Sequence, residues 1–142
     1  MTIYQFDLKI PADTPEEEPF EVEAEIEEEV LVRGLVIFPP GCRGMVYSKI
    51  MYGQLQIAPR PFGSAFKGDG VVIPFELWRV LPDRPTKLRL LGWSPGTSYD
   101  HTITYYLIAL PYWVAFWYVG LHNFVKIFSQ LTGIPLEERR LI

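Results

Sequence analysis

Hydrophobic and polar residues alternate along much of the first part of this chain. The segment IYQFDLKI places Tyr4, Phe6, Leu8 and Ile10 on one face of an extended strand, and FEVEAEIEEE alternates in the same way. A period of two is typical of a strand with one buried face and one solvated face. Prolines and glycines, 13 and 11 in number, interrupt the chain every few residues. The pattern predicts about eight short strands separated by turns.

The middle of the chain continues in short extended segments. VLVRGLVIF is a nearly continuous apolar run that ends at Pro39-Pro40-Gly41, and it predicts a buried strand. Further strands are predicted for MVYSKIMYG, QLQIAP, VVIPFELW, TKLRLLGW and HTITYYLIAL, and Pro74 requires an edge or bulge position. We therefore expect an all-β fold, an antiparallel β-sandwich, with a jelly roll as one candidate strand order.

One α-helix is expected near the C-terminus. Residues 102–125 contain no Asp, Glu, Lys or Arg, and Pro111 divides them. The part before Pro111 is rich in Thr, Ile and Tyr, which favour strands. Pro111 suits the first turn of a helix, and Gly133 with Pro135 suits its end, so a helix is predicted over residues 112–132.

The chain is therefore expected to contain a single β-sandwich domain and two C-terminal additions. The sandwich covers residues 1–110, the helix covers 111–133, and a charged tail covers 134–142. The N-terminal segment MTIYQFDLKI has neither the basic region nor the apolar run of a signal peptide.

Large apolar residues recur along the predicted helix at intervals of four and three, like the seam of a coiled coil. A helix of this length extends over about 31 Å, and a single face packed on a small sandwich cannot hide all of its aromatic residues. An exposed apolar patch of this kind marks an interface. We expect that interface to comprise Trp113, Phe116, Trp117, Gly120, Phe124, Ile127 and Leu131.

Three kinds of cover are open for this surface: protein, lipid, or the chain's own sandwich. Lys126, His122 and Asn123 fall in the C-terminal half of the helix, and the aromatic residues gather at one end. A membrane-spanning helix more often carries aromatic residues at both interfaces. We therefore favour a homo-oligomer or another protein as the partner and keep a membrane contact through residues 112–132 as an alternative.

Acidic residues are concentrated near the second predicted strand. The outward face of FEVEAEIEEE is strongly negative, and it is formed by Glu21, Glu23, Glu25 and Glu27. The interpretation that we favour is a solvated outer strand whose charges discourage edge-to-edge aggregation. The alternative is a docking face for a basic partner.

Candidate catalytic chemistry is sparse. The single cysteine, Cys42, has no His or acid near it in the sequence, and we expect a buried free thiol in a reducing compartment. The two histidines, His101 and His122, are far apart, and Cys and His do not recur with zinc spacing. We therefore expect no enzyme activity, no metal site and no cofactor.

The sequence also bears on nucleic acid and sugars as ligands. The net charge of −4 argues against nucleic acid, because phosphate binding needs clustered Lys and Arg. Trp78, Trp93 and Tyr99 could form a stacking platform for sugars, which would make the chain a carbohydrate- or ligand-binding module. Aromatic residues of the core or of an interface are the interpretation that we favour.

Three segments together resemble a family of small β-sandwich proteins encoded among the virion genes of head-tailed viruses and proviruses. They are FPPGCRGMVYSKIMYGQLQIAP, FKGDGVVIPF and LRLLGWSPGTSYDHTITYYLIALP. The shared pattern includes a Pro-Gly turn, a strand pair around YGQLQIAP, a Gly-Asp-Gly turn, the pair Gly92-Trp93 and an Asp-His-Thr segment that begins at Asp100. The similar region covers roughly residues 30–111.

The resemblance implies a structural virion protein of the capsid or tail accessory (decoration) type. Such a protein would act by self-association and by docking on other virion structural proteins, and its location would be the virion, assembled in the host cytoplasm. The resemblance implies no catalytic residues. It leaves the acidic strand and the aromatic helix unassigned, and a membrane-anchored module held by that helix stays an alternative.

Overall fold

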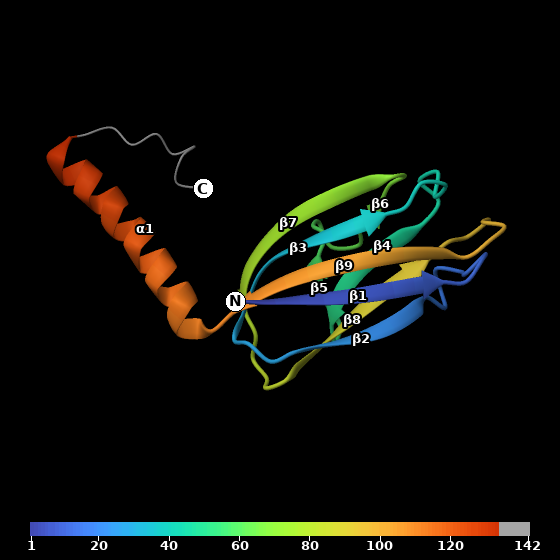
Figure 1. The fold of residues 1–142 in the computed structure, drawn as a ribbon, viewed down its shortest axis with the longest axis horizontal. Helices are drawn as coiled ribbons and strands as arrows, with labels where there is room; N and C mark the ends of the chain where they lie inside the picture. Colours follow the sequence, from blue (N-terminus) through green and yellow to red (C-terminus); the bar gives the residue numbers. More distant parts are fainter. Residues whose placement is uncertain (134–142) are drawn as a thin grey trace.

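A computed structural model of the chain describes residues 1–133, and it shows two facing antiparallel sheets with one helix leaving them at an end (Figure 1). The first sheet contains, in spatial order, β1 (Thr2–Ile10), β9 (His101–Leu110), β3 (Val30–Phe38) and β7 (Val71–Val80). The second contains β2 (Phe20–Ile26), β8 (Thr86–Trp93), β4 (Tyr47–Tyr52) and β5 (Leu55–Ala58), and the short β6 (Phe66–Lys67) pairs with β4.

The chain passes repeatedly from one sheet to the other. The strands β1, β3, β7 and β9 lie in the first sheet, while β2, β4, β5 and β8 lie in the second. The two spatial orders, β1-β9-β3-β7 and β2-β8-β4-β5, are those of a jelly roll. The predicted all-β sandwich with a single C-terminal helix is confirmed, and Pro74 lies on the edge strand β7 as expected.

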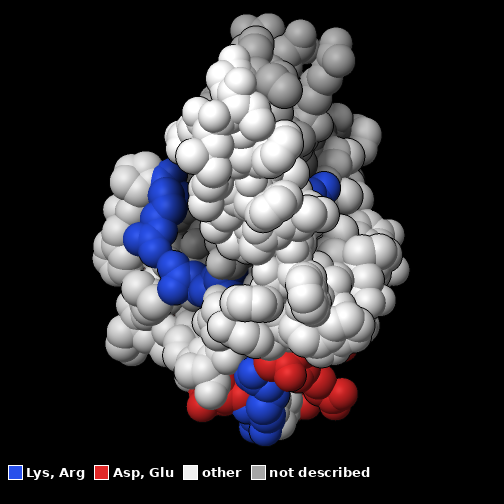
Figure 2. All heavy atoms as spheres, turned by 90° about the vertical axis from the view of Figure 1, so that its left-hand side faces the viewer, with Lys and Arg blue, Asp and Glu red and all other residues white. Residues whose placement is uncertain are grey.

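The helix α1 (Tyr112–Thr132) has the predicted bounds. Pro111 precedes it in extended conformation, and Gly133 ends it in the left-handed region with φ 71°. Seen from the helix side, uncharged side chains cover the middle of the molecule, Lys and Arg side chains lie at the left, and acidic and basic side chains gather at the bottom of the view (Figure 2). The charged tail expected over residues 134–142 lies outside the described residues.

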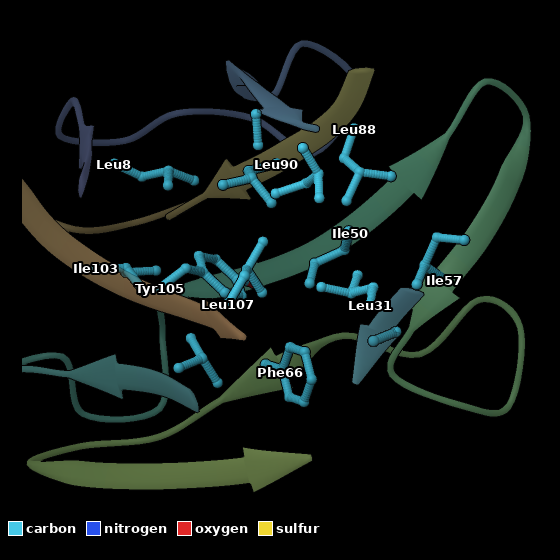
Figure 3. Packing of buried hydrophobic residues seen from close by; sticks show 14 of the residues in the cluster. Leu8, Leu31, Ile50, Ile57, Phe66, Leu88, Leu90, Ile103, Tyr105 and Leu107 are labelled. Atoms are coloured by element: carbon cyan, nitrogen blue, oxygen red, sulfur yellow. The ribbon is translucent and has the colours of Figure 1, made fainter. Parts of the chain in front are cut away.

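The core fills the space between the two sheets. Inward side chains of both sheets, among them Leu8, Ile50, Leu90 and Leu107, are fully buried and pack into one cluster (Figure 3). The alternation predicted for the first strand is confirmed, because its even-numbered residues from Tyr4 to Ile10 all belong to or pack against this cluster.

One polar contact crosses the core. The hydroxyl of Tyr105 on β9 and the hydroxyl of Ser48 on β4 are hydrogen-bonded at 2.6 Å, and Ser48 also donates to the carbonyl of Leu91 at 2.7 Å. The contact joins the two sheets and satisfies both buried hydroxyls, as a dry core requires. Burial raises the pKa of the Tyr105 phenol well above its ordinary value, and the bond to Ser48 offsets part of that rise.

Gly92, part of the Gly-Trp pair in the resemblance, faces this core. A Cβ atom there would lie 2.4 Å from Cδ1 of Ile10, which is itself fully buried. Ile10 and Gly92 therefore fill one position together, and a larger residue at 92 would overpack it.

One sequence expectation was wrong in part. VLVRGLVIF was predicted to be a buried strand, but β3 is buried continuously only over its first three residues, Val30 to Val32. Beyond them, Val36 and Phe38 point into the core, whereas Leu35 and Ile37 point outward and stay half-buried. The strand is apolar on both faces, and the sandwich covers only one of them along this part.

The raised pKa of Tyr105 predicts a loss of stability at high pH. The phenol titrates near pH 10 in the unfolded chain but higher in the fold, so above pH 10 the folded state holds one more proton. The free energy of unfolding should fall by up to about 1.4 kcal/mol per pH unit from this group alone. Urea titrations of the parent and of Tyr105→Phe between pH 9 and 12 measure this effect. Equal slopes for both proteins would contradict it.

Candidate functional site

The helix α1 carries most of the large apolar side chains that are exposed within residues 1–133. Ala115 is the one buried residue in α1, which lies wholly within the described part of the chain. The six large side chains of the predicted interface are each at least 55% exposed: Trp113, Phe116, Trp117, Phe124, Ile127 and Leu131. At Gly120, an added Cβ would meet no atom within 4 Å. The structure therefore brings the predicted seam to solvent as one continuous surface.

The start of α1 is held by the sandwich. The carbonyl of Pro111 accepts hydrogen bonds from the amides of Val114 and Ala115. The amide of Tyr112 donates to the carboxylate of Glu29 at 3.2 Å. A carboxylate at a helix N-terminus satisfies a free amide and interacts favourably with the helix dipole. Glu29 therefore couples the helix start to the segment before β3, a role that sequence analysis did not assign.

Trp78 on β7 forms the main contact between the sandwich and the helix. Its ring stacks on Tyr118 with centroids 5.0 Å apart and planes 10° from parallel. Its backbone has φ 47°, a strained value for a bulky residue. The pairing of β3 with β7 shifts register at the same place, between Leu31 and Arg33. The irregular backbone thus turns the Trp78 ring toward α1, and Ala115 packs nearby against Val30 and Val32.

A small apolar hollow lies beside this contact. It has a volume of about 190 Å³ and is lined by residues of β3, β7 and α1, including Val80 and Phe116. Because the helix is anchored only near its first turns, the surface beyond Tyr118 projects away from the sandwich (Figure 1).

The acidic strand β2 is paired with a basic neighbour. Glu23 and Glu25 lie 3.6 and 4.0 Å from the ammonium group of Lys87 on β8, and Glu21 forms an ion pair with Arg89. All of these side chains are more than a third exposed. Glu27 does not continue the strand as predicted, because β2 ends at Ile26. The negative face is therefore partly neutralised within its own sheet.

The fold brings Cys42 and His101 together, although they lie 59 residues apart and sequence analysis did not pair them. Cys42 Sγ lies 3.7 Å from Nδ1 of His101, and both residues are buried. The ring of Tyr99 lies against His101 with centroids 4.5 Å apart. A hollow of about 290 Å³ opens beside these residues. A thiol beside an imidazole is the arrangement of a cysteine nucleophile and its base.

The electrostatics disfavour a reactive thiol at Cys42. Burial raises the pKa of the thiol, and the carboxylate of Asp69 raises it further. A reactive cysteine needs the opposite, a lowered pKa and access to solvent. The carboxylate of Asp100 accepts a hydrogen bond from the amide of Ala12 at 2.8 Å, and β9 begins at His101. Asp100 therefore joins its own loop to the segment that follows β1.

The three residues of the candidate sugar platform lie in different surroundings. Trp78 lines the hollow beside α1, Trp93 lines a second hollow near β6, and Tyr99 lines a third beside Cys42. Trp93 is buried and stacks on Tyr47 with centroids 5.9 Å apart. The structure does not bring these three residues together into one platform.

Within residues 1–133, His, Cys, Asp and Glu do not gather in any group of three or more that could hold a metal ion. Over the same residues, no helix is long and apolar enough to cross a membrane.

The paired charges of β2 predict a small effect of charge reversal. In Glu23→Lys/Glu25→Lys, stability should fall by about 1 kcal/mol or less per pair and the oligomeric mass should stay unchanged, because exposed ion pairs contribute little. Thermal unfolding and light scattering measure the two quantities, with Glu17→Lys in the preceding loop as a control. A large, salt-sensitive loss of assembly in the double variant alone would identify this face as a docking site.

Cys42 should react slowly with alkylating agents. Because its pKa is raised and its sulfur is buried, iodoacetamide at pH 8 should modify the native protein at least about tenfold more slowly than the urea-unfolded protein. Mass spectrometry over a time course measures both rates. Faster reaction in the native state would instead identify an activated thiol.

Neither a family model, nor a curated protein, nor a solved structure matches this chain. The inference of function therefore depends on the arrangement of its own residues.

Proposed function

We propose that this protein is a structural virion protein, of the capsid or tail accessory type, that self-associates through α1 and docks on a viral lattice. One observation carries the proposal: a helix of 21 residues with a single buried residue and a continuous row of exposed aromatic side chains. Soluble proteins rarely leave an apolar patch of this extent in water, and such patches mark interaction sites.

The apolar surface of α1 can supply the free energy of assembly. Burying Trp113, Trp117 and Phe124, each 64–69% exposed, removes on the order of 400 Å² from water, worth about 10 kcal/mol. Association costs about 4–15 kcal/mol in lost freedom of motion. A contact through α1 can therefore offset that cost only if most of its aromatic residues are covered, which favours an extended interface.

The viral part of the proposal is supported by the resemblance of residues 30–111 to sandwiches encoded among virion genes. A jelly roll supplies a rigid body, and α1 supplies an adhesive arm that projects from one end of it (Figure 1). The raised pKa of the buried Cys42 thiol favours a structural over an enzymatic role.

Trp117→Glu tests self-association through α1. The substitution places a charge in the centre of the apolar row, so it should convert the parent's oligomer into monomers while the strand signal in circular dichroism stays unchanged. Light scattering coupled to gel filtration measures the mass. The matched control is Asn123→Glu, which adds the same charge at an exposed polar position of the same helix and should keep the parent's mass.

Two results would contradict the proposal. One is a Trp117→Glu variant that assembles as well as the parent. The other is a parent protein that stays with membranes through salt and carbonate washes and is released only by detergent, which would identify lipid as the partner of α1.

A further inference from the structure

Six residues of α1 lie along one side of the helix at intervals of four and three. We call them the helix seam: Trp113, Trp117, Gly120, Phe124, Ile127 and Leu131. At 3.6 residues per turn, Ala115 and Tyr118, which pack against the sandwich, lie on the opposite side of the helix. Lys126, the single ionic residue of α1, lies on that opposite side as well. The helix seam therefore faces away from the sandwich and carries no charge.

The sizes of the residues in the helix seam are complementary about the middle of α1. Each residue has a counterpart that is equally far from His122 on the other side: Trp113 with Leu131, Trp117 with Ile127, and Gly120 with Phe124. A second α1 that runs in the opposite direction, with His122 at the same height, places the two members of each pair opposite each other. Every pair then joins an aromatic residue to a smaller one, as interdigitating layers require.

Gly120 leaves a gap in the helix seam that the chain itself does not use. Its backbone is helical, so no positive φ requires a glycine there. An added Cβ would meet no atom within 4 Å, so no packing within residues 1–133 requires a glycine either. Glycine inside a helix is also less favourable than alanine. The gap therefore fits a group from outside the chain, and in the reversed arrangement the ring of Phe124 from a second copy lies opposite it.

We propose that α1 pairs with α1 of a second copy in antiparallel orientation, with Phe124 of each copy in the gap at Gly120 of the other. The inference rests on the proposed function and names the partner surface and its direction. The pair has two-fold symmetry, so both copies use the same surface and the contact closes after two chains. Because the sandwich lies at the start of α1 (Figure 1), the two sandwiches of the dimer lie at opposite ends of the helix pair.

A parallel pair would match the helix seam less well. Each residue would lie opposite the same residue of the second copy, so Gly120 would meet Gly120 and leave a void. In other layers Trp117 would meet Trp117, and Phe124 would meet Phe124. A void forfeits contacts, and two large residues in one layer crowd each other. The antiparallel pair avoids both faults, because none of its layers contains two glycines or two aromatic residues.

The apolar surface around the helix seam is large enough for a dimer. Five aromatic residues of α1 are 53–69% exposed and together present on the order of 600 Å² per copy: Trp113, Phe116, Trp117, Phe124 and Phe128. In a symmetric pair both copies bury this surface, so the contact removes on the order of 1,200 Å² from water, which reaches the range of stable interfaces. The helix seam contains no ionic residue, so its burial desolvates no charge.

Crosslinking from the two ends of the helix seam measures the orientation. In a Cys42→Ser background, Trp113→Cys and Leu131→Cys each place one thiol at one end of the seam. In an antiparallel pair, position 131 of one copy lies beside position 113 of the other but about 27 Å along the axis from its own equivalent. A short bismaleimide should therefore crosslink the mixture of the two variants at least about tenfold more than either variant alone, because only the mixture brings two thiols within reach. Denaturing gel electrophoresis measures the crosslinked dimer.

Gly120→Leu tests the gap in a chain that keeps Cys42. The added side chain meets Phe124 of the second copy, so the dissociation constant of the dimer should rise at least about tenfold, as overpacking predicts. The helix should form as well as in the parent, since leucine favours helices more than glycine does. The matched control is His122→Leu, which places the same side chain on the opposite side of α1 and should keep the parent's constant. Sedimentation equilibrium measures both constants. Tighter association of Gly120→Leu would indicate that Gly120 faces Gly120, as in a parallel pair, and would overturn the inference.

These results separate the inference from the proposed function. If Leu131→Cys alone crosslinks as well as the mixture, the helices run parallel, and the inference is overturned while self-association through α1 stands. The same holds if Trp117→Glu lowers the parent's mass but no sample crosslinks, because α1 then contacts a different surface. A parent that is monomeric, or whose mass Trp117→Glu leaves unchanged, overturns the inference and the proposed self-association together.

Discussion

Removal of apolar surface from water is the constraint on which this structure depends. The jelly roll satisfies it between the sheets, where inward side chains such as Leu8, Ile50 and Leu107 are fully buried and the Tyr105–Ser48 hydrogen bond pairs the buried hydroxyls. The helix α1 remains outside that solution, because Ala115 is its one buried residue. A monomer leaves most of the apolar surface of α1 in water, and the partner contact proposed above would remove that surface from water.

The junction between sandwich and helix sets the direction of the arm. Pro111 restricts the backbone, Glu29 accepts a hydrogen bond from the first amide of the helix, and Trp78 stacks on Tyr118 nearly two turns further on. The positive φ of Trp78 is backbone strain that the surrounding pairing must hold in place. Strain at this position has a geometric effect, because it turns an aromatic ring away from the sheet and toward the helix. A rigid junction reduces the entropy that the arm loses when it binds.

Local signals in the sequence were sufficient to predict the strands and the helix. They were not sufficient to predict which other parts of the protein pack against each of them. Pro111 and Gly133 determine the bounds of α1, and alternation determines the inward residues of β1 and β2. The apolar run of β3 is different. Its composition shows that both faces of the strand are apolar, but it does not show whether the domain covers both faces or only one. Likewise, Cys42 and His101 lie 59 residues apart, and only the order of strands brings them within 3.7 Å. The exposed row on α1 was predictable since its size alone exceeds what one small sandwich can hide.

Both outer faces of the sandwich carry ion pairs. The first sheet presents Leu35, Ile37 and Tyr106 beside the ion pair of Arg33 with Glu76, and the second presents ion pairs between β2 and β8. Charged side chains on an edge strand oppose further strand pairing and keep their water. A contact on either sheet face would therefore desolvate charged side chains, whereas the row of large side chains on α1 contains no Asp, Glu, Lys or Arg. Covering α1 is thus the way to remove apolar surface from water that costs the least desolvation of charge.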